Sequence, residues 1–395
     1  MAKSLTILCL FLCLLSQKIV SQEETRAEVY LLTCGPGTET YSIYGHTALR
    51  IVLPERGTDL VYNWGVFDFS TPNFAWKFAR GRLNYMLGVS TFENFLKEYV
   101  YEKRWVISQR VNLSNDQINT LFTLINENLK PENIQYLYDF FYDNCSTRVR
   151  DLLEKSTGKN LIYPPDEPLK SQPTFRQKIR EYQKNFAWLN FGIDLLLGSP
   201  ADRKASFRDR MFLPVDLYTN MSKLLVNTEG KMIPLLQNPV TVVSFDNASE
   251  KPGMINSPLF LFSILAILVI ILSGTFRGKK FNNLLDISLF AVFSILALMM
   301  IFFNFFTDHH QLKWNLNVIW LNPFIPVCLA SLVLNKNWQT FFRICFFLAL
   351  FFLVFIAILP QQINDAFVPL IIILLIRTSA RSGFKWNPLT LPYLT

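Results

Sequence analysis

Hydrophobic and polar positions alternate in short runs along the first third of the chain. Within residues 28–113, the runs EVYLLT, HTALRIVL, LVYNWGVF, RLNYMLGV and RWVISQRVNL alternate with the period of a β-strand. Apolar positions recur with helical spacing around residues 74–80 and 92–101. The stretch SNDQ has the form of a capping box and predicts a further helix that continues through Leu129. The pattern therefore predicts a mixed α+β domain.

A second helix start lies in the stretch FYDNCSTRVRDLL, which runs from Phe141 to Leu153. The aromatic and acidic residues at its beginning are typical of the end of a strand. Asn144 is a good N-cap residue, and apolar residues recur at helical spacing after it. The helix is therefore predicted to begin at or just after Cys145. Residues 160–257 show few periodic patterns and are rich in Pro, Asn and charge, so we interpret them as irregular packing followed by a tether.

The chain changes character at Pro258, where long apolar runs begin. They cover residues 258–276, 285–306, 318–334, 341–359 and 363–376. The first four approach the length of about 20 residues that a membrane-spanning helix needs, and the fifth is shorter. Residues 258–395 are therefore predicted to form an α-helical membrane bundle of about five helices.

Two independent signals predict the orientation of this bundle. Residues 1–21 have a basic start, an apolar run too short to span a bilayer and a polar exit, which is the pattern of a secretory signal peptide. The connections FRGKKFNN and LNKNWQTFFR and the tail RTSARSGFKW are basic, whereas TDHHQLKWN and PQQIND carry little positive charge. Both signals place residues 22–257 on the outer face of the membrane, as the exported domain of a multi-pass membrane protein.

The net charge of +8 largely reflects the same asymmetry. From Pro258 onward, nine Lys or Arg residues stand against three Asp residues. We interpret this excess as a topology signal and expect no nucleic-acid partner.

Cys145 is the first candidate for chemistry, because a thiol at a helix N-terminus faces unpaired N–H groups and the positive end of the helix dipole. A cysteine nucleophile needs a base, and His46 is the one histidine of the exported domain. Gly45 precedes it and a strand follows, so the imidazole is expected at a strand end. Asn63 and Asp68, on the next predicted strand, are candidates to orient that imidazole.

Other interpretations of these residues stay open. Cys34, in the turn-forming stretch TCGPG, is a rival nucleophile or a substrate contact. A disulfide between Cys34 and Cys145 is a further alternative, because an exported domain lies in an oxidising compartment. The alternative for His46 is an ordinary, partly buried histidine without a catalytic role. His309 and His310 lie in a predicted outward loop without the spacing of a metal site, so we expect no metal and no cofactor. That loop suits phospholipid headgroups or a substrate amine.

Several stretches resemble the Lnb family of bacterial lipoprotein N-acyltransferases. They are LLTCGPGTETYSIYGHTALRI, DLVYNWGVFDFSTPNFAWKFARG, FYDNCSTRVRDLL, LLGSPADRKASFRDRMFLPVDL and DHHQLKWNLNVIWLNPF. A Cys after an upstream His also resembles the permuted papain-like proteins of the NlpC and lecithin:retinol acyltransferase (LRAT) type. The resemblance implies a multi-pass protein of the bacterial cytoplasmic (inner) membrane with residues 22–257 in the periplasm. It also implies the permuted papain-like fold for this periplasmic domain and a catalytic pair of Cys145 and His46, to which we add Asn63.

Around this group we assign Cys34, Tyr44, Asn144 and His309 to substrate binding. The resemblance implies transfer of an acyl chain, through a Cys145 thioester, to the α-amine of a lipidated N-terminal cysteine. Membrane phospholipids and lipoproteins are then the partners, with the phospholipid or the lipoprotein glyceride as donor. The alternatives are a membrane-anchored cysteine hydrolase, either a cell-wall amidase or a phospholipase, and a non-enzymatic sensor. Five membrane helices favour the transferase, because a soluble-substrate hydrolase needs one anchor at most.

Overall fold

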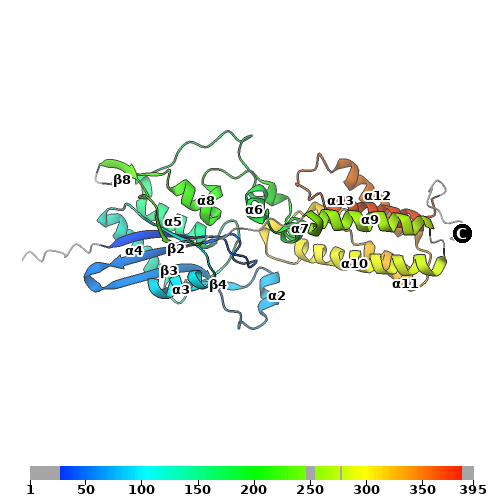
Figure 1. Cartoon of the computed structure of the whole chain (residues 1–395), viewed down its shortest axis with the longest axis horizontal. Coiled ribbons are helices and arrows are strands. Elements are labelled where there is room, and N and C mark those ends of the chain that lie inside the picture. Colours follow the sequence, from blue (N-terminus) through cyan, green and yellow to red (C-terminus); the bar gives the residue numbers. More distant parts are fainter. Residues whose placement is uncertain (1–26, 229, 246–253, 276–277, 385–395) are drawn as a thin grey trace, which may run out of the picture.

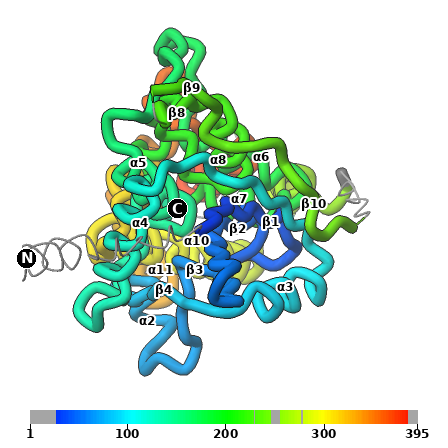
Figure 2. Tube along the Cα trace, turned by 90° about the vertical axis from the view of Figure 1, so that its left-hand side faces the viewer, coloured from blue at the N-terminus to red at the C-terminus, as the bar shows by residue number. Residues whose placement is uncertain are grey.

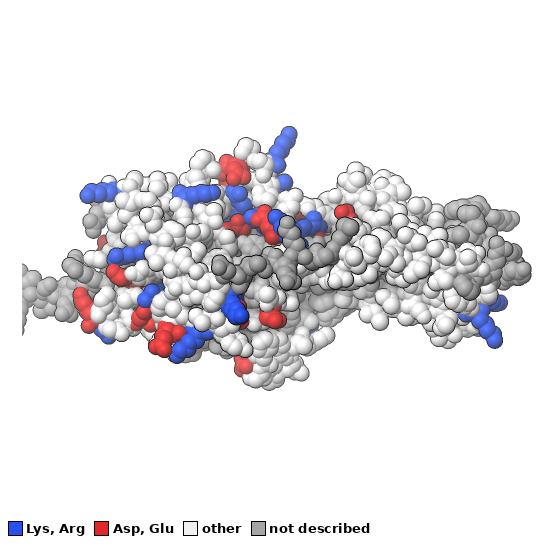
Figure 3. Space-filling view, in the orientation of Figure 1, with Lys and Arg blue, Asp and Glu red and all other residues white. Residues whose placement is uncertain are grey.

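The computed structural model describes residues 27–228, 230–245, 254–275 and 278–384. The predicted signal peptide, residues 1–21, lies outside these ranges. The molecule is elongated, with a sheet-containing part at one end and a helical bundle at the other (Figure 1). Charged side chains are spread over the first part and gather again at the far end of the bundle, and the bundle surface between them is largely uncharged (Figure 3).

One antiparallel sheet of seven strands dominates the described N-terminal part, in the order β10-β5-β1-β2-β3-β4-β6. The strands are β1 (Glu28–Cys34), β2 (His46–Leu53), β3 (Thr58–Val66), β4 (Asn84–Thr91), β5 (Val106–Arg110), β6 (Gln135–Leu137) and β10 (Val240–Val243). Cys34 pairs with His46 at the end of the β1–β2 ladder. This register brings the end of one strand and the start of the next to the same edge of the sheet.

Helices cover both faces of the sheet (Figure 2). On one face lie α4 (Asn115–Asn128), α5 (Cys145–Thr157) and α8 (Pro214–Met221). On the other lies α3 (Phe92–Tyr101). On the face covered by α5, Leu49 and Trp64 pack in one hydrophobic core with Val149. On the face covered by α3, Ala48 and Val61 belong to a separate hydrophobic core. The alternation predicted from the sequence therefore buries both faces, as expected for a sheet between two helical layers.

The segment 160–257 is more regular than we predicted. It contains α6 (Phe175–Gln183), α7 (Ala187–Leu196), α8, a small sheet of β7 (Leu161–Ile162), β8 (Leu225–Thr228) and β9 (Lys231–Pro234), and strand β10. The prediction of irregular packing was wrong because these elements are short and stabilised by distant partners. Phe175 stacks on Phe141 at a centroid distance of 4.8 Å, and β10 pairs with β5.

Five apolar helices form the C-terminal bundle in the described residues: α9 (Pro258–Thr275), α10 (Lys279–Phe305), α11 (Ile325–Val333), α12 (Gln339–Phe355) and α13 (Phe367–Arg381). Of these, α9 and α10 are long and apolar enough to cross a membrane by length and composition. The third predicted run, 318–334, is helical only from Ile325, because its first part turns around a buried Asn317 that accepts a hydrogen bond from Trp320 Nε1 at 3.0 Å.

Candidate active site

A strand start positions His46. Gly45 has a φ of 79°, in the left-handed region, and a Cβ there would lie 2.7 Å from the carbonyl oxygen of Cys34. Glycine is therefore required for the chain to enter β2 at this angle. Asn63 lies on the neighbouring β3, and its Oδ1 is 2.5 Å from His46 Nε2. Because Oδ1 only accepts, Nε2 carries the hydrogen, and Nδ1 is the ring nitrogen left to face a thiol.

Cys145 is the first residue of α5, as the sequence predicted. The side chain of Asn144 accepts hydrogen bonds from the amides of Ser146 and Thr147 at 2.8 and 2.9 Å, and Thr147 Oγ1 accepts one from the Asn144 amide at 2.7 Å. This capping box fixes the first turn of the helix and thereby the direction of the thiol. The thiol thus sits at the positive end of a helix of 13 residues.

The electrostatics of the site favour an ion pair. Burial raises the pKa of Cys145, but the charge of His46 and hydrogen bonds from His46, the Thr47 amide and Ser146 outweigh it, so the pKa of the thiol is lowered overall. For His46, burial lowers the pKa, and the Cys145 charge with the bonds to Cys145 and Asn63 raises it overall. Cys145 is 8% exposed, so little water screens this pair. The arrangement stabilises a thiolate beside an imidazolium.

Cys34 has a different environment from Cys145. It is fully buried with Leu32, Phe95 and Tyr99, and burial raises the pKa of its thiol. Both cysteines are free thiols in the described structure. The position of Cys34 favours a packing role over the nucleophilic or substrate-contacting roles considered from the sequence.

Two further predicted substrate contacts build the loop before Cys145. Asn144 Nδ2 donates to the carbonyl oxygens of Phe140 and Phe212 at 2.7 and 3.0 Å, so its amide is occupied on both sides. Tyr44 packs against Phe140 at a centroid distance of 4.9 Å, and its hydroxyl accepts a hydrogen bond from Gln183 Nε2 at 2.8 Å. Asn144 and Tyr44 therefore both contact Phe140, in the aromatic segment that precedes Cys145.

Asp68, the other candidate for orienting the imidazole, is bonded to a different partner. Its carboxylate accepts hydrogen bonds from the amide and the hydroxyl of Ser70, at 2.8 and 2.6 Å, within an exposed turn. Asn63 is therefore the residue of the two that contacts the imidazole.

His309 lies at the junction with the membrane part, where it contacts the short helix α2 (Phe74–Ala79). Its Nε2 is 3.0 Å from the carbonyl oxygen of Phe78, and its backbone and ring pack against Gly81. Asp308 forms an ion pair with Arg82 at 2.5 Å. No group of three or more His, Cys, Asp or Glu side chains within the described ranges is placed to hold a metal ion. The predicted outward loop therefore joins the two parts of the protein.

Gln311 is a residue of this loop that the sequence gave no reason to select. It donates a hydrogen bond to Asp139 Oδ1, which also accepts from the amides of Phe141 and Tyr142, both at 2.9 Å. These bonds shape the turn that leads into Cys145. Since Gln311 and Asp139 are 172 positions apart, no local pattern announces the contact.

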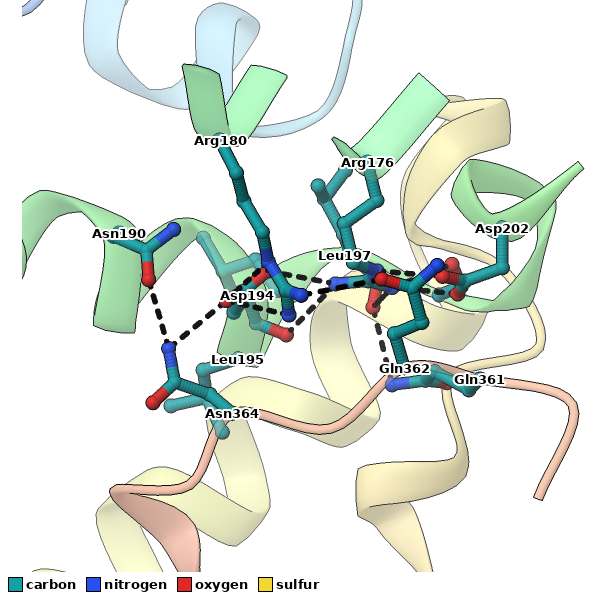
Figure 4. Close-up of polar contacts among 12 residues, drawn as sticks. Arg176, Arg180, Asn190, Asp194, Leu195, Leu197, Asp202, Gln361, Gln362 and Asn364 are labelled. Carbon is teal, nitrogen blue, oxygen red and sulfur yellow. Dashed lines mark hydrogen bonds and ion pairs between the residues drawn. The ribbon is translucent and has the colours of Figure 1, made fainter. Parts of the chain in front are cut away.

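A second polar cluster joins α6 and α7 to the connection before α13 (Figure 4). Arg176 contacts Asp194 and Asp202 at 3.1 and 3.0 Å. Asn364 Nδ2 donates to Asp194 Oδ2 at 2.9 Å, and Gln361 Nε2 donates to the carbonyl oxygen of Leu197 at 3.3 Å. The part of the molecule that carries Cys145 is therefore fastened to the bundle through two separate loops.

Comparison with known protein families agrees with this two-part architecture. The model of the Lnb N-terminal periplasmic domain matches residues 21–184, and that of the Lnb transmembrane domain matches residues 249–385. No curated protein and no solved structure matches the chain. The chain therefore belongs to the Lnb family and is a membrane protein with a periplasmic α+β domain followed by a helical transmembrane domain.

Proposed function

We propose that this protein is a lipoprotein N-acyltransferase in which Cys145 carries the acyl group. The observation that carries the proposal is the grouping of Cys145, His46 and Asn63 at one edge of a sheet that is fastened to a membrane bundle. Membership of the Lnb family supports an enzyme. We also propose a permuted papain-like fold for the periplasmic domain, because a helix that begins with Cys145 packs on a sheet whose earlier strand begins with His46.

The first half-reaction takes the acyl group from a membrane glycerolipid. The Cys145 thiolate attacks the carbonyl carbon of an ester, and the new C–S bond forms as the C–O bond to glycerol breaks. The departing glycerol oxygen takes the proton from the His46 imidazolium. Asn63 keeps the imidazole oriented during this transfer, as its hydrogen bond to Nε2 leaves Nδ1 toward the sulfur. The products are a thioester on Cys145 and a lysolipid.

The second half-reaction delivers the acyl group to an amine. The α-amine of a lipidated N-terminal cysteine attacks the thioester carbonyl, the C–N bond forms and the C–S bond breaks. Neutral His46 takes the proton that the amine loses, which restores the imidazolium beside the thiolate. Acceptor and donor both reside in the membrane, which is why attachment of this site to a bundle supports transfer rather than hydrolysis of a soluble peptide.

The test separates transfer from hydrolysis. Purified full-length protein in phospholipid nanodiscs receives a synthetic diacylglyceryl lipopeptide, and mass spectrometry follows its N-terminus. We expect an added N-acyl chain with the wild type and none with Cys145→Ser. In cells, the N-termini of lipoproteins should lose the same chain when the protein is absent. Release of free fatty acid without N-acylated product would replace the proposal with a cysteine hydrolase.

A further inference from the structure

Aromatic rings that are distant in sequence form a continuous strip on the periplasmic part. The strip consists of Phe78, Phe74, Phe67, Tyr85 and Tyr138. Trp76 belongs to the same short helix, α2, but lies on another side of it than Phe74 and Phe78. It crosses α2, the end of β3 and strand β4, and it links the bundle side of the domain with the vicinity of Cys145. Its inner rings belong to the domain core, because Tyr85 is buried there and Phe67, Phe74 and Tyr138 pack against it, whereas Phe78 is exposed.

The outer end of the strip is exposed and continues the apolar surface of the bundle. Trp76 and Phe78 are 55% and 53% exposed, so one short helix presents two large apolar rings to its surroundings. The Trp76 ring lies 5.5 Å from that of Phe302, near the end of α10. Phe305 and Phe306, which follow on the same end, are also exposed. Because α10 is long and apolar enough to span a membrane, the exposed end of the strip meets the lipid-facing surface at this junction.

The position of α2 beside the bundle is fixed by several contacts. The amide of Asp308 donates to the carbonyl oxygen of Arg80 at 2.9 Å, in addition to the Asp308–Arg82 ion pair and the His309 contact to Phe78. Gly81 has a φ of 71° and lies against His309, where a Cβ would approach the ring and backbone to 3.2 Å. The exposed rings of α2 are therefore held at the junction by the predicted outward loop.

The inner end of the strip reaches the nucleophile. The rings of Phe67 and Tyr85 are 5.2 Å apart, and those of Tyr85 and Tyr138 stack at 4.5 Å. Tyr138 and Cys145 then meet at Gly65, where an added Cβ would lie 3.8 Å from Cys145 Cβ and 3.8 Å from Tyr138 Cε2. Gly65, which has no side chain, therefore lies between the Tyr138 ring and Cys145.

We infer that α2 is the acyl-chain contact of the enzyme: it enters the outer leaflet, and its exposed rings hold one acyl chain of a membrane glycerolipid at the outer end of the strip that leads to Cys145. The inference rests on the proposed acyl transfer for its purpose. The ligand class follows from the continuity with the lipid-facing end of α10 and from the charges beside the strip. Lys77 lies on α2 and the guanidinium of Arg80 lies 5.6 Å from the Trp76 ring centroid, so cations sit beside an apolar face, as at a headgroup boundary.

Direct contact is tested by photo-crosslinking in the full-length Cys145→Ser variant. The protein is placed in nanodiscs that contain phosphatidylcholine with a diazirine on one acyl chain, and cross-linked peptides are mapped after irradiation. We expect adducts within residues 67–82 as well as on α10. The hairpin β8–β9 serves as an internal control, because it exposes Met232 at the end of the molecule away from the bundle (Figure 1). Adducts confined to the bundle helices would overturn the inference.

The functional arm uses Trp76→Ser/Phe78→Ser against Met232→Ser as a matched exposed control. We expect the double variant to lose at least about tenfold in kcat/KM for a long-chain phospholipid donor, because two rings no longer bury apolar surface against lipid. The rate of Cys145 alkylation by iodoacetamide should stay at the wild-type value in both, which shows an intact site. Unchanged kcat/KM in the double variant would contradict the inference.

The two arms separate this inference from the proposed function. Adducts within 67–82 without any N-acyl transfer by the wild type would support the lipid contact and overturn the transferase. N-acyl transfer by the wild type, with no adducts in this segment and no effect of Trp76→Ser/Phe78→Ser, would overturn the strip and leave the transferase in place.

Discussion

Two buried polar regions lie on the bundle side of the periplasmic part. One is the edge of the sheet around Cys145, and the other is the cluster of Arg176, Asp194 and Asp202, which we call the joint. They differ in how completely their polar groups are hydrogen-bonded. At the joint, the Arg176 guanidinium donates to Asp202, Asp194 and the carbonyl oxygens of Leu197 and Gly198, so its charge is fully compensated. At the sheet edge, the charge on the sulfur depends on where one proton resides.

This comparison teaches that burial of polar groups does not by itself mark a reactive site. A saturated cluster holds two elements together and has no group available for a substrate. A pair whose pKa values are shifted toward each other keeps a nucleophile and a proton carrier ready. Substitutions in the two regions should therefore have opposite effects on activity and on stability.

The largest effect is expected at the sheet edge. Cys145→Ser and His46→Ala should each lower acyl transfer by at least about a thousandfold, because the nucleophile and its base work as one unit. The double variant should be little worse than either single one. Lipopeptide N-acylation in nanodiscs measures the loss, and thermal unfolding should stay close to the wild type. Cys34→Ser is the control thiol: an inactive Cys34→Ser beside an active Cys145→Ser would show that the nucleophile was chosen wrongly.

At the joint, Arg176→Ala should act on stability. Removal of the cation leaves the buried carboxylate of Asp202 uncompensated, which costs about 3–5 kcal/mol. The unfolding temperature in detergent should fall clearly, whereas Cys145 alkylation at low temperature should persist. Lys130→Ala, which removes an exposed ion pair with Glu127, should change the unfolding temperature little. Equal effects of the two variants would contradict the saturated-joint interpretation.

A smaller effect is expected for Asn63→Ala, which removes the partner of His46 Nε2. The imidazole then loses its fixed tautomer and orientation but keeps its contact with the thiol, so kcat should fall about 10–100-fold with KM nearly unchanged. Asn63→Gln, which restores an amide oxygen, should recover part of the rate. A wild-type kcat in Asn63→Ala would remove Asn63 from the site.

The finest test is the pH dependence of Cys145 alkylation. The lowered pKa of Cys145 and the raised pKa of His46 predict that the reactive thiolate appears below the ordinary thiol range. Any contribution of the lowered Cys145 pKa to the stability of the fold is lost as pH falls through that pKa, and any contribution of the raised His46 pKa is lost as pH rises through that pKa. In His46→Ala the midpoint of alkylation should move upward. An unmoved midpoint would mean that the helix terminus alone lowers the pKa of the thiol.

Local elements were within reach of the sequence by itself. The strand His46–Leu53 and the helix Phe92–Tyr101 have the bounds that the alternation predicts, and α5 begins at Cys145 behind its Asn144 cap. These features depend on neighbours in the chain, namely side-chain periodicity and a cap that satisfies nearby amides. The scarcity of histidine likewise pointed to His46, since the exported part contains one imidazole.

Only the tertiary structure decided which distant groups meet. It joined β10 to β5, buried Cys34 in the core, bonded Asn63 to His46 and brought Gln311 to the turn before Cys145. It also assembled the aromatic strip and the Arg176 joint, whose members lie on separate elements. The physical reason is that a strand order, a buried contact and a shifted pKa depend on packing between segments far apart in the chain, which leaves no periodic trace in either segment alone.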